Sequence, residues 1–291
     1  MVKKIVDIFF LLRPRQWIKN LFVFTPFIFS GQAVFGRNTI EVLWVFILFC
    51  LLSSACYAFN DVIDVKEDRK HPIKKRRPVA AGKIKRESAL ATSVLLAVIV
   101  LMISFHINHK FTIVALAYLL LNVAYSIWLK HSMIIDLFVI STGFLLRVYA
   151  GAMAIHVSIS SWLMISIFML AFFLGAGKRR GDVILSRRIP SLKKGNSVIL
   201  KYSKEFLNDL TFFSLILINV TYLFYTVFSS FPMLFSVVFV LYGTLRYWYL
   251  LQRHPAYPDP TDFILRDRPL LFVIVLWGIY VRGATWLTLG H

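Results

Sequence analysis

Three aspartates near residue 60 are spaced so that their carboxylates can share one face of a helix. Asp61, Asp64 and Asp68 lie three and four positions apart, and each helical residue advances about 100° around the axis. Mg²⁺ commonly joins one or two such carboxylates to the phosphates of a ligand. The basic run 74–77 follows closely and could contact those phosphates. The pattern therefore predicts a site for a magnesium-bound diphosphate, with Asp61, Asp64 and Asp68 as metal ligands and catalytic residues.

A second interpretation of these acids is a solvated helix end. Lys66, Arg69 and Lys70 are close enough in sequence to pair with the aspartates. The carboxyl end of a helix disfavours negative charge, so a positive partner is expected in either case. Three acids together with Asn60 and the cationic block favour the metal site.

The chain is too apolar for a soluble domain. Hydrophobic residues make up 58% of its 291 residues, whereas soluble domains average about 45–50%. A cleavable signal peptide is not expected, because Asp7 and Arg13 interrupt the first apolar stretch. Long apolar runs predict an all-α integral membrane protein with nine transmembrane helices, at 20–36, 40–59, 88–107, 111–129, 133–153, 160–177, 209–229, 232–251 and 268–288. Because Pro26 and Gly31 interrupt the first run, it is also compatible with a re-entrant segment.

The net charge of +19 is concentrated in a few connections. The residues before the first run and two long polar segments, 60–87 and 178–208, contain most of the Lys and Arg. By the positive-inside rule these segments face the cytoplasm. We therefore expect a multi-pass protein of the inner (cytoplasmic) membrane, with capping loops and an active site on the cytoplasmic side. Topology and anionic ligands account for the basic excess, so nucleic acid is not expected as a partner.

The acidic motif also resembles a known family. The pattern N-D-x-x-D-x-x-x-D at 60–68, followed by basic residues and R-P-x-A-x-G at 77–82, is similar to the first aspartate-rich motif of the UbiA superfamily of intramembrane prenyltransferases. Further similarity covers nearly the whole chain, including Tyr125-Ser126, Leu129-Lys130 and Gly143 through Arg147. The resemblance implies one domain over residues 1–291, with the helices around a central cavity that the polar loops cap.

One departure from the superfamily pattern bears on the donor substrate. Typical members have a second motif resembling D-x-x-x-D, whereas here Asp182 is followed four residues later by Ser186. R-P-R-Q-W-x-K-N at 13–20, the acidic motif, G-K-R-R at 177–180 and T-D-F-x-L-R-D-R-P at 261–269 are together similar to the decaprenyl-phosphate phosphoribosyltransferase branch. That similarity implies Mg²⁺-dependent transfer of 5-phosphoribosyl from phosphoribosyl diphosphate to a polyprenyl phosphate, for cell-envelope polysaccharide precursors.

Both substrates implied by this similarity are polyanions, so cationic side chains are expected to bind them. The phosphate of the acceptor is already a nucleophile near neutral pH, so no catalytic base is expected. We expect the substrate-binding side chains to be Lys19, Asn60, Lys74, Arg77, Tyr125, Arg147, Lys178, Arg179, Arg180 and Asp182. For the run 178–180 a purely topological role is the alternative. Arg147 lies within an apolar run, so it either faces the cavity or pairs with an acid such as Asp136.

Other functions fit parts of the sequence. A prenyltransferase that moves a prenyl group from prenyl diphosphate to an aromatic or lipid acceptor would share the first motif, but the second acidic pair is missing. A transporter should have charges in several membrane helices, and few residues here qualify. The expected partners are phosphoribosyl diphosphate, polyprenyl phosphate and membrane lipid, and association into a homo-oligomer is left open.

Overall fold

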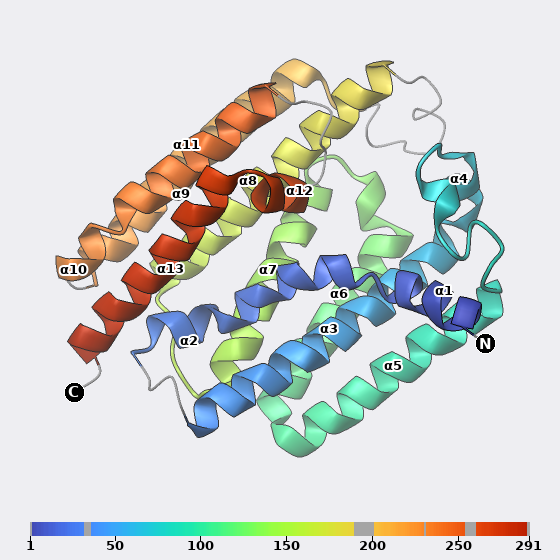
Figure 1. Cartoon of the computed structure of the whole chain (residues 1–291), viewed down its shortest axis with the longest axis horizontal. Helices are drawn as coiled ribbons and strands as arrows, with labels where there is room; N and C mark the ends of the chain where they lie inside the picture. The colour runs from blue at the N-terminus through green and yellow to red at the C-terminus, as the bar shows by residue number, and fades with distance from the viewer. Residues whose placement is uncertain (1, 32–35, 189–200, 230, 254–259, 290–291) are drawn as a thin grey trace.

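The computed structural model describes residues 2–31, 36–188, 201–229, 231–253 and 260–289, and all regular structure in these ranges is helical (Figure 1). This confirms the all-α expectation. Eight helices are long and apolar enough to cross a membrane. They are α3 (Arg37–Ile63), α5 (Arg86–Ile107), α6 (His109–Ile127), α7 (Ile135–Ala154), α8 (Ser161–Arg188), α9 (Lys204–Val227), α10 with α11 (Phe231–Leu234 and Val237–Arg253) and α13 (Arg268–Leu289).

The first expected span, 20–36, is not one continuous helix in the described part of the chain. A 3-10 segment, η1 (Pro14–Phe24), leads into the short helix α2 (Thr25–Phe29). Pro26 lies in the first turn of α2, where a residue without an N–H is tolerated. In the described ranges, eight of the nine expected spans are thus long apolar helices, and the first is this broken segment.

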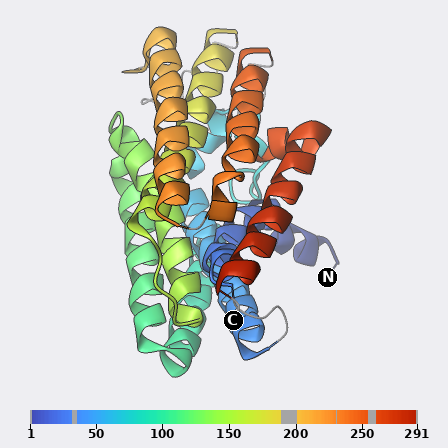
Figure 2. The ribbon, with the colours of Figure 1, turned by 90° about the vertical axis from the view of Figure 1, so that its left-hand side faces the viewer.

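The bundle is built around α3, α7 and α8, which are the most buried of the long helices. Helices α3, α5, α6 and α7 form one half, and α9, α11 and α13 pack beyond α8 in the other (Figure 1). Seen from the side, the long helices run next to one another (Figure 2). Helices α5, α6 and α13 expose many large apolar side chains on their outer faces, as expected for surfaces in contact with lipid.

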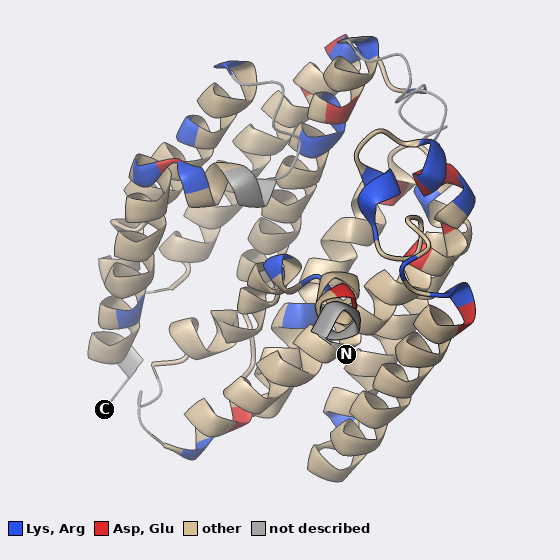
Figure 3. Cartoon of the chain, turned by 45° about the vertical axis from the view of Figure 1, so that its right-hand side comes forward, with Lys and Arg blue, Asp and Glu red and all other residues tan. Residues whose placement is uncertain are grey.

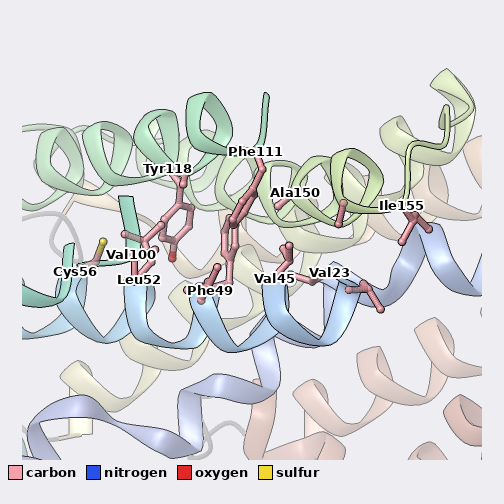
Figure 4. Close-up of a cluster of buried hydrophobic side chains, with 14 residues drawn as sticks. Val23, Val45, Phe49, Leu52, Cys56, Val100, Phe111, Tyr118, Ala150 and Ile155 are labelled. Atoms are coloured by element: carbon pink, nitrogen blue, oxygen red, sulfur yellow. The ribbon is translucent and has the colours of Figure 1, made fainter. Parts of the chain in front are cut away.

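A large apolar cluster joins α3, α6, α7 and η1 (Figure 4). The ring of Phe49 on α3 lies 5.2 Å from that of Tyr118 and 6.2 Å from that of Phe111, both on α6. Gly151 lets η1 approach α7, because a Cβ at this position would lie 1.9 Å from the carbonyl oxygen of Val23. The broken segment is thus held against the bundle by close backbone packing, as in other membrane helix contacts that use small residues.

Charged residues gather at one end of the bundle (Figure 3). The short elements α4 (Val65–Lys70) and η2 (Lys74–Arg76) cover this end, and η3 (Leu129–His131) follows α6 there. Helix α1 (Val2–Leu12) packs beside α3, and α12 (Pro260–Arg266) precedes α13. The structure therefore brings together the described parts of the segments that the charge pattern assigned to one side of the membrane, and which side they face stays a prediction.

Candidate active site

A cavity of about 630 Å³ lies among η1, α3, α6, α7 and α8. Its lining contains most of the predicted site residues, namely Lys19, Asn60, Asp64, Lys74, Arg77, Tyr125, Arg147, Lys178, Arg179 and Asp182. Apolar side chains from η1 and α7, including Ile18, Phe22 and Phe144, complete the wall. Asp61, Asp68 and Arg180 lie outside the lining.

The Asp61 carboxylate is buried beneath the cavity, with 1% of the residue exposed. Its Oδ1 accepts hydrogen bonds from Arg13 and from Nη1 of Arg77, the latter at 3.1 Å. The same Arg77 nitrogen donates to Oδ2 of Asp68 at 2.7 Å. Asp61 Oδ2 is buried and has no hydrogen-bond partner among the described residues. Since an unpartnered buried carboxylate oxygen is costly, Oδ2 is the atom of Asp61 that is suited to a further cation.

Asp64 borders the cavity and has its own partners. Its Oδ2 accepts from Nδ2 of Asn60 at 2.9 Å, and Oδ1 pairs with Lys130 from η3. The acids thus pair with residues distant in sequence, whereas Lys66, Arg69 and Lys70 are exposed. The solvated helix end, with those three cations as partners, is therefore not the arrangement observed.

The carboxylates suit a magnesium ion only if a ligand supplies the remaining oxygens. In the described ranges, no three His, Cys, Asp or Glu side chains converge as a metal-binding group. Mg²⁺ needs only one or two protein carboxylates when phosphates complete its shell, and Asp61 Oδ2 and Asp64 fit that role. Asp68 is less accessible, because Arg77 binds it, and burial raises the pKa of its carboxyl above the usual value.

The loop after α4 presents Lys74 and Arg77 to the cavity. His71 shapes this loop, because its Nδ1 accepts hydrogen bonds from the backbone N–H groups of Ile73 and Lys74 at 3.2 and 3.1 Å. Burial and the neighbouring Lys74 and Arg77 lower the pKa of His71 to about 4, so its ring stays neutral near pH 7. Burial and Arg77 also lower the pKa of Lys74, while Asp68 and Asp182 oppose that shift. Lys74 thus shares the cavity lining with the end of α8.

Arg147 lies on α7, with 5% of the residue exposed. Its Nε donates to Oδ1 of Asn20 at 2.8 Å, and its Nη1 and Nη2 donate to Gly143 O and Tyr118 Oη, both at 2.7 Å. All three acceptors are uncharged. Arg147 therefore borders the cavity as predicted, and the suggested ion pair with Asp136 is not formed, because Asp136 binds another arginine.

That arginine is Arg179 on α8. Its Nε donates to Oδ2 of the buried Asp136 at 2.6 Å, and its Nη2 donates to Tyr125 Oη at 3.2 Å. Nη1 lies 3.5 Å from Oδ2 of Asp182. The guanidinium is thus oriented by partners on three helices where it borders the cavity.

The adjacent Arg180 points elsewhere. Its guanidinium donates to Oδ1 of Asn208 at 2.5 Å, to Leu251 O at 2.7 Å and to Oε1 of Gln252 at 2.7 Å. These contacts join α8 to α9 and α11, so they do not support the predicted substrate contact. Ser186, at the position of the missing second acid, is also buried, and its hydroxyl donates to Val183 O at 2.8 Å.

Four residues that the sequence analysis left out of the candidate site contact the predicted ones: Arg13, Asn20, Tyr118 and Lys130. Arg13, Asn20 and Lys130 belong to stretches in which the sequence resembles the UbiA superfamily, so the resemblance could have pointed to them. Tyr118 lies in an apolar run, where an aromatic residue gives no such signal.

An all-helical membrane domain around a cavity with acids and cations at one end is the architecture of an intramembrane transferase. Residues 22–265 match the model of the UbiA prenyltransferase family, and the chain belongs to that family. The chain is 30% identical over 282 residues to a decaprenyl-phosphate phosphoribosyltransferase of Mycobacterium tuberculosis, covering 94% of this chain and 92% of the relative.

A second relative of the same name, from Mycolicibacterium smegmatis, is 37% identical over 181 residues. That match covers 61% of this chain and only 57% of the relative. Among solved structures, a UbiA homolog from Archaeoglobus fulgidus bound to DMAPP and Mg²⁺ has a TM-score of 0.77, over 96% of this chain and 99% of that chain. At 16% identity, this likeness concerns the fold alone.

Proposed function

We propose that this chain transfers the 5-phosphoribosyl group of 5-phosphoribosyl 1-diphosphate to a polyprenyl phosphate and releases diphosphate. The reaction would be magnesium-dependent, would occur at the cytoplasmic side of the inner membrane and would supply a precursor for cell-envelope polysaccharide. The names of the relatives support this substrate pair. The observation that supports it most directly is that cations border the cavity from two sides, the loop after α4 and helix α8, so that two separate phosphate groups of one donor can be held.

On the α3 side, Asp61 Oδ2 and Asp64 would hold Mg²⁺, which neutralises charge on the leaving diphosphate when bound. Lys74 and Arg77 border the same region and are suited to donate to the diphosphate oxygens. Lys178 and Arg179 border the cavity on α8, where Asp182 is already close to Arg179. This basic side suits the 5-phosphate, which a second pair of acids would repel.

The transfer needs no protein base. The bond between ribose C1 and the diphosphate oxygen breaks, its electron pair leaves with diphosphate, and an oxygen of the lipid phosphate bonds to C1. That oxygen is already anionic, so no proton has to be removed. The ribose becomes oxocarbenium-like as the bond breaks, and fixed cations around the departing oxygens favour that state.

Arg147 supports the binding of an anionic lipid substrate. Its charge has no carboxylate partner among the described residues and lies within a membrane-spanning helix, so a substrate phosphate is a suitable counter-charge. The neighbouring Ile18, Phe22 and Phe144 suit an isoprenoid chain. A cation beside apolar side chains therefore matches a polyprenyl phosphate.

The deciding experiment offers two labelled donors to the purified protein with Mg²⁺ and polyprenyl phosphate. We expect label from phosphoribosyl diphosphate to appear in a new lipid product and label from prenyl diphosphate to stay in the unreacted donor when the products are separated by chromatography. Transfer of prenyl label without phosphoribosyl transfer would instead identify the chain as a prenyltransferase of the kind common in the family.

A further inference from the structure

Tyr202 lies in the connection between α8 and α9, and its hydroxyl reaches the start of α7. It donates to Oδ1 of Asp136 at 2.9 Å and accepts from the backbone N–H of Ile134 at 2.6 Å. Tyr202 is 4% exposed, Asp136 is fully buried, and the Tyr202 ring packs beside Phe206. Because burial raises the pKa of Tyr202, the hydroxyl keeps its proton and remains a donor.

Asp136 connects this tyrosine to the cavity. One carboxylate oxygen accepts from Tyr202 and the other from Nε of Arg179, at 2.9 and 2.6 Å. Arg179 borders the cavity, while neither Asp136 nor Tyr202 does. The two residues therefore act on the cavity only through the orientation of the Arg179 guanidinium.

The backbone at this junction is strained. Ile134 has φ of +67°, a conformation that a β-branched residue rarely adopts and that costs on the order of 1–3 kcal/mol. The N–H of Ile134 donates its hydrogen bond to the Tyr202 hydroxyl. The hydroxyl thus holds both the strained backbone before α7 and the carboxylate two residues later, which fixes Asp136 relative to α8.

We propose that Tyr202 and Asp136 are positioning residues that orient Arg179 toward the donor substrate. Tyr202 would thereby set the geometry of a substrate contact from outside the cavity lining. The inference rests on the proposed function, because the orientation of Arg179 matters only if its guanidinium binds a phosphate of phosphoribosyl diphosphate.

The test compares Tyr202→Phe with a matched control, Tyr222→Phe. Tyr222 is also 4% exposed, and its hydroxyl bonds Ser236 at 2.8 Å and Trp277 at 3.0 Å, outside the cavity lining. Each variant removes one buried hydroxyl with two partners, so similar losses of thermal stability are expected. Only Tyr202→Phe should raise the KM for phosphoribosyl diphosphate, by about 3- to 10-fold, the range of one neutral hydrogen bond, with kcat less affected.

A double variant separates positioning from general damage. In an Arg179→Lys background, Tyr202→Phe should raise the KM for phosphoribosyl diphosphate no further, because Lys lacks the planar guanidinium group that Tyr202 and Asp136 orient. Equal KM values for Tyr202→Phe and Tyr222→Phe, or a full extra effect in the Arg179→Lys background, would overturn the positioning role while wild-type phosphoribosyl transfer still supports the proposed function. A wild-type protein that transfers no phosphoribosyl group would overturn both.

Discussion

Replacing Asp61 by Asn tests the acidic end of the cavity with little change of shape. The amide oxygen can still accept from Arg13 and Arg77, but the negative charge between the two guanidinium groups is lost. Oδ2, the buried oxygen without a partner, is also replaced by an uncharged group. The variant therefore separates a structural hydrogen-bond acceptor from a magnesium ligand.

The two roles predict different magnitudes. Replacing the charged acceptor of two guanidinium groups by a neutral amide oxygen should lower the free energy of unfolding by about 1–3 kcal/mol. Losing a metal ligand should lower turnover at least about 100-fold, which corresponds to roughly 2.7 kcal/mol of transition-state stabilisation. A folded variant with such a loss would assign Asp61 to the reaction.

Initial rates of phosphoribosyl transfer over a magnesium titration, together with thermal unfolding in detergent, measure both effects. Asp7→Asn is the control, because Asp7 pairs with Lys83 at 3.4 Å near the surface and lies outside the cavity lining. An exposed pair of this kind contributes about 0–1 kcal/mol. Wild-type turnover of Asp61→Asn at ordinary magnesium, or an equal loss in Asp7→Asn, would refute the metal role.

Three further predictions concern helix packing, the pH dependence of stability and membrane topology. Gly151→Ala should destabilise the fold by about 1–3 kcal/mol or more in thermal unfolding, since its Cβ would meet the η1 backbone, whereas Gly283→Ala, with nothing within 4 Å, should not. The pKa of His71 is lowered from its ordinary 6.5 to about 4 in the folded protein. As the pH falls from 6.5 toward 4, the unfolded chain therefore binds a proton at His71 before the folded protein does, and the free energy of unfolding decreases. An Asn there, which can replace the ring as turn acceptor, should flatten this part of the profile of unfolding temperature against pH. In a cysteine-free background, Lys75→Cys should label only from the cytoplasmic side and Lys110→Cys only from the other; the reverse would overturn the topology.

The spans were predictable because lipid leaves few alternatives. A backbone without water must satisfy its hydrogen bonds internally, so long apolar runs become helices whatever their neighbours. The run at 20–36 is the exception, because Pro26 begins a new helix and the close approach at Gly151 depends on a packing partner 125 or more residues away. Local sequence identifies such a break but not the element against which the broken segment packs.

The candidate site was predictable as a set of residues but not as a set of pairs. Asp136 and Arg147 were considered as an ion pair, yet both lie on α7, where eleven residues at a rise of about 1.5 Å place them some 16 Å apart. Helix arithmetic therefore excludes this pair once both residues are assigned to one span. Asp136 instead pairs with Arg179, and Arg147 bonds Asn20 and Tyr118. These partners are distant in sequence, so they depend on how the helices pack.

The same arithmetic separates Arg179 from Arg180. The cavity lining on α8 consists of Ala171, Leu174, Gly175, Lys178, Arg179 and Asp182, which follow the spacing of three and four that defines one helix face. If Asp182 faces the cavity, Lys178 and Arg179 must lie on its side, and Arg180, about 100° further round, must face the neighbouring helices. The run of three cations thus contains two residues that border the cavity and one that joins neighbouring helices, a division that follows from the helical period once a single member of the face has been placed.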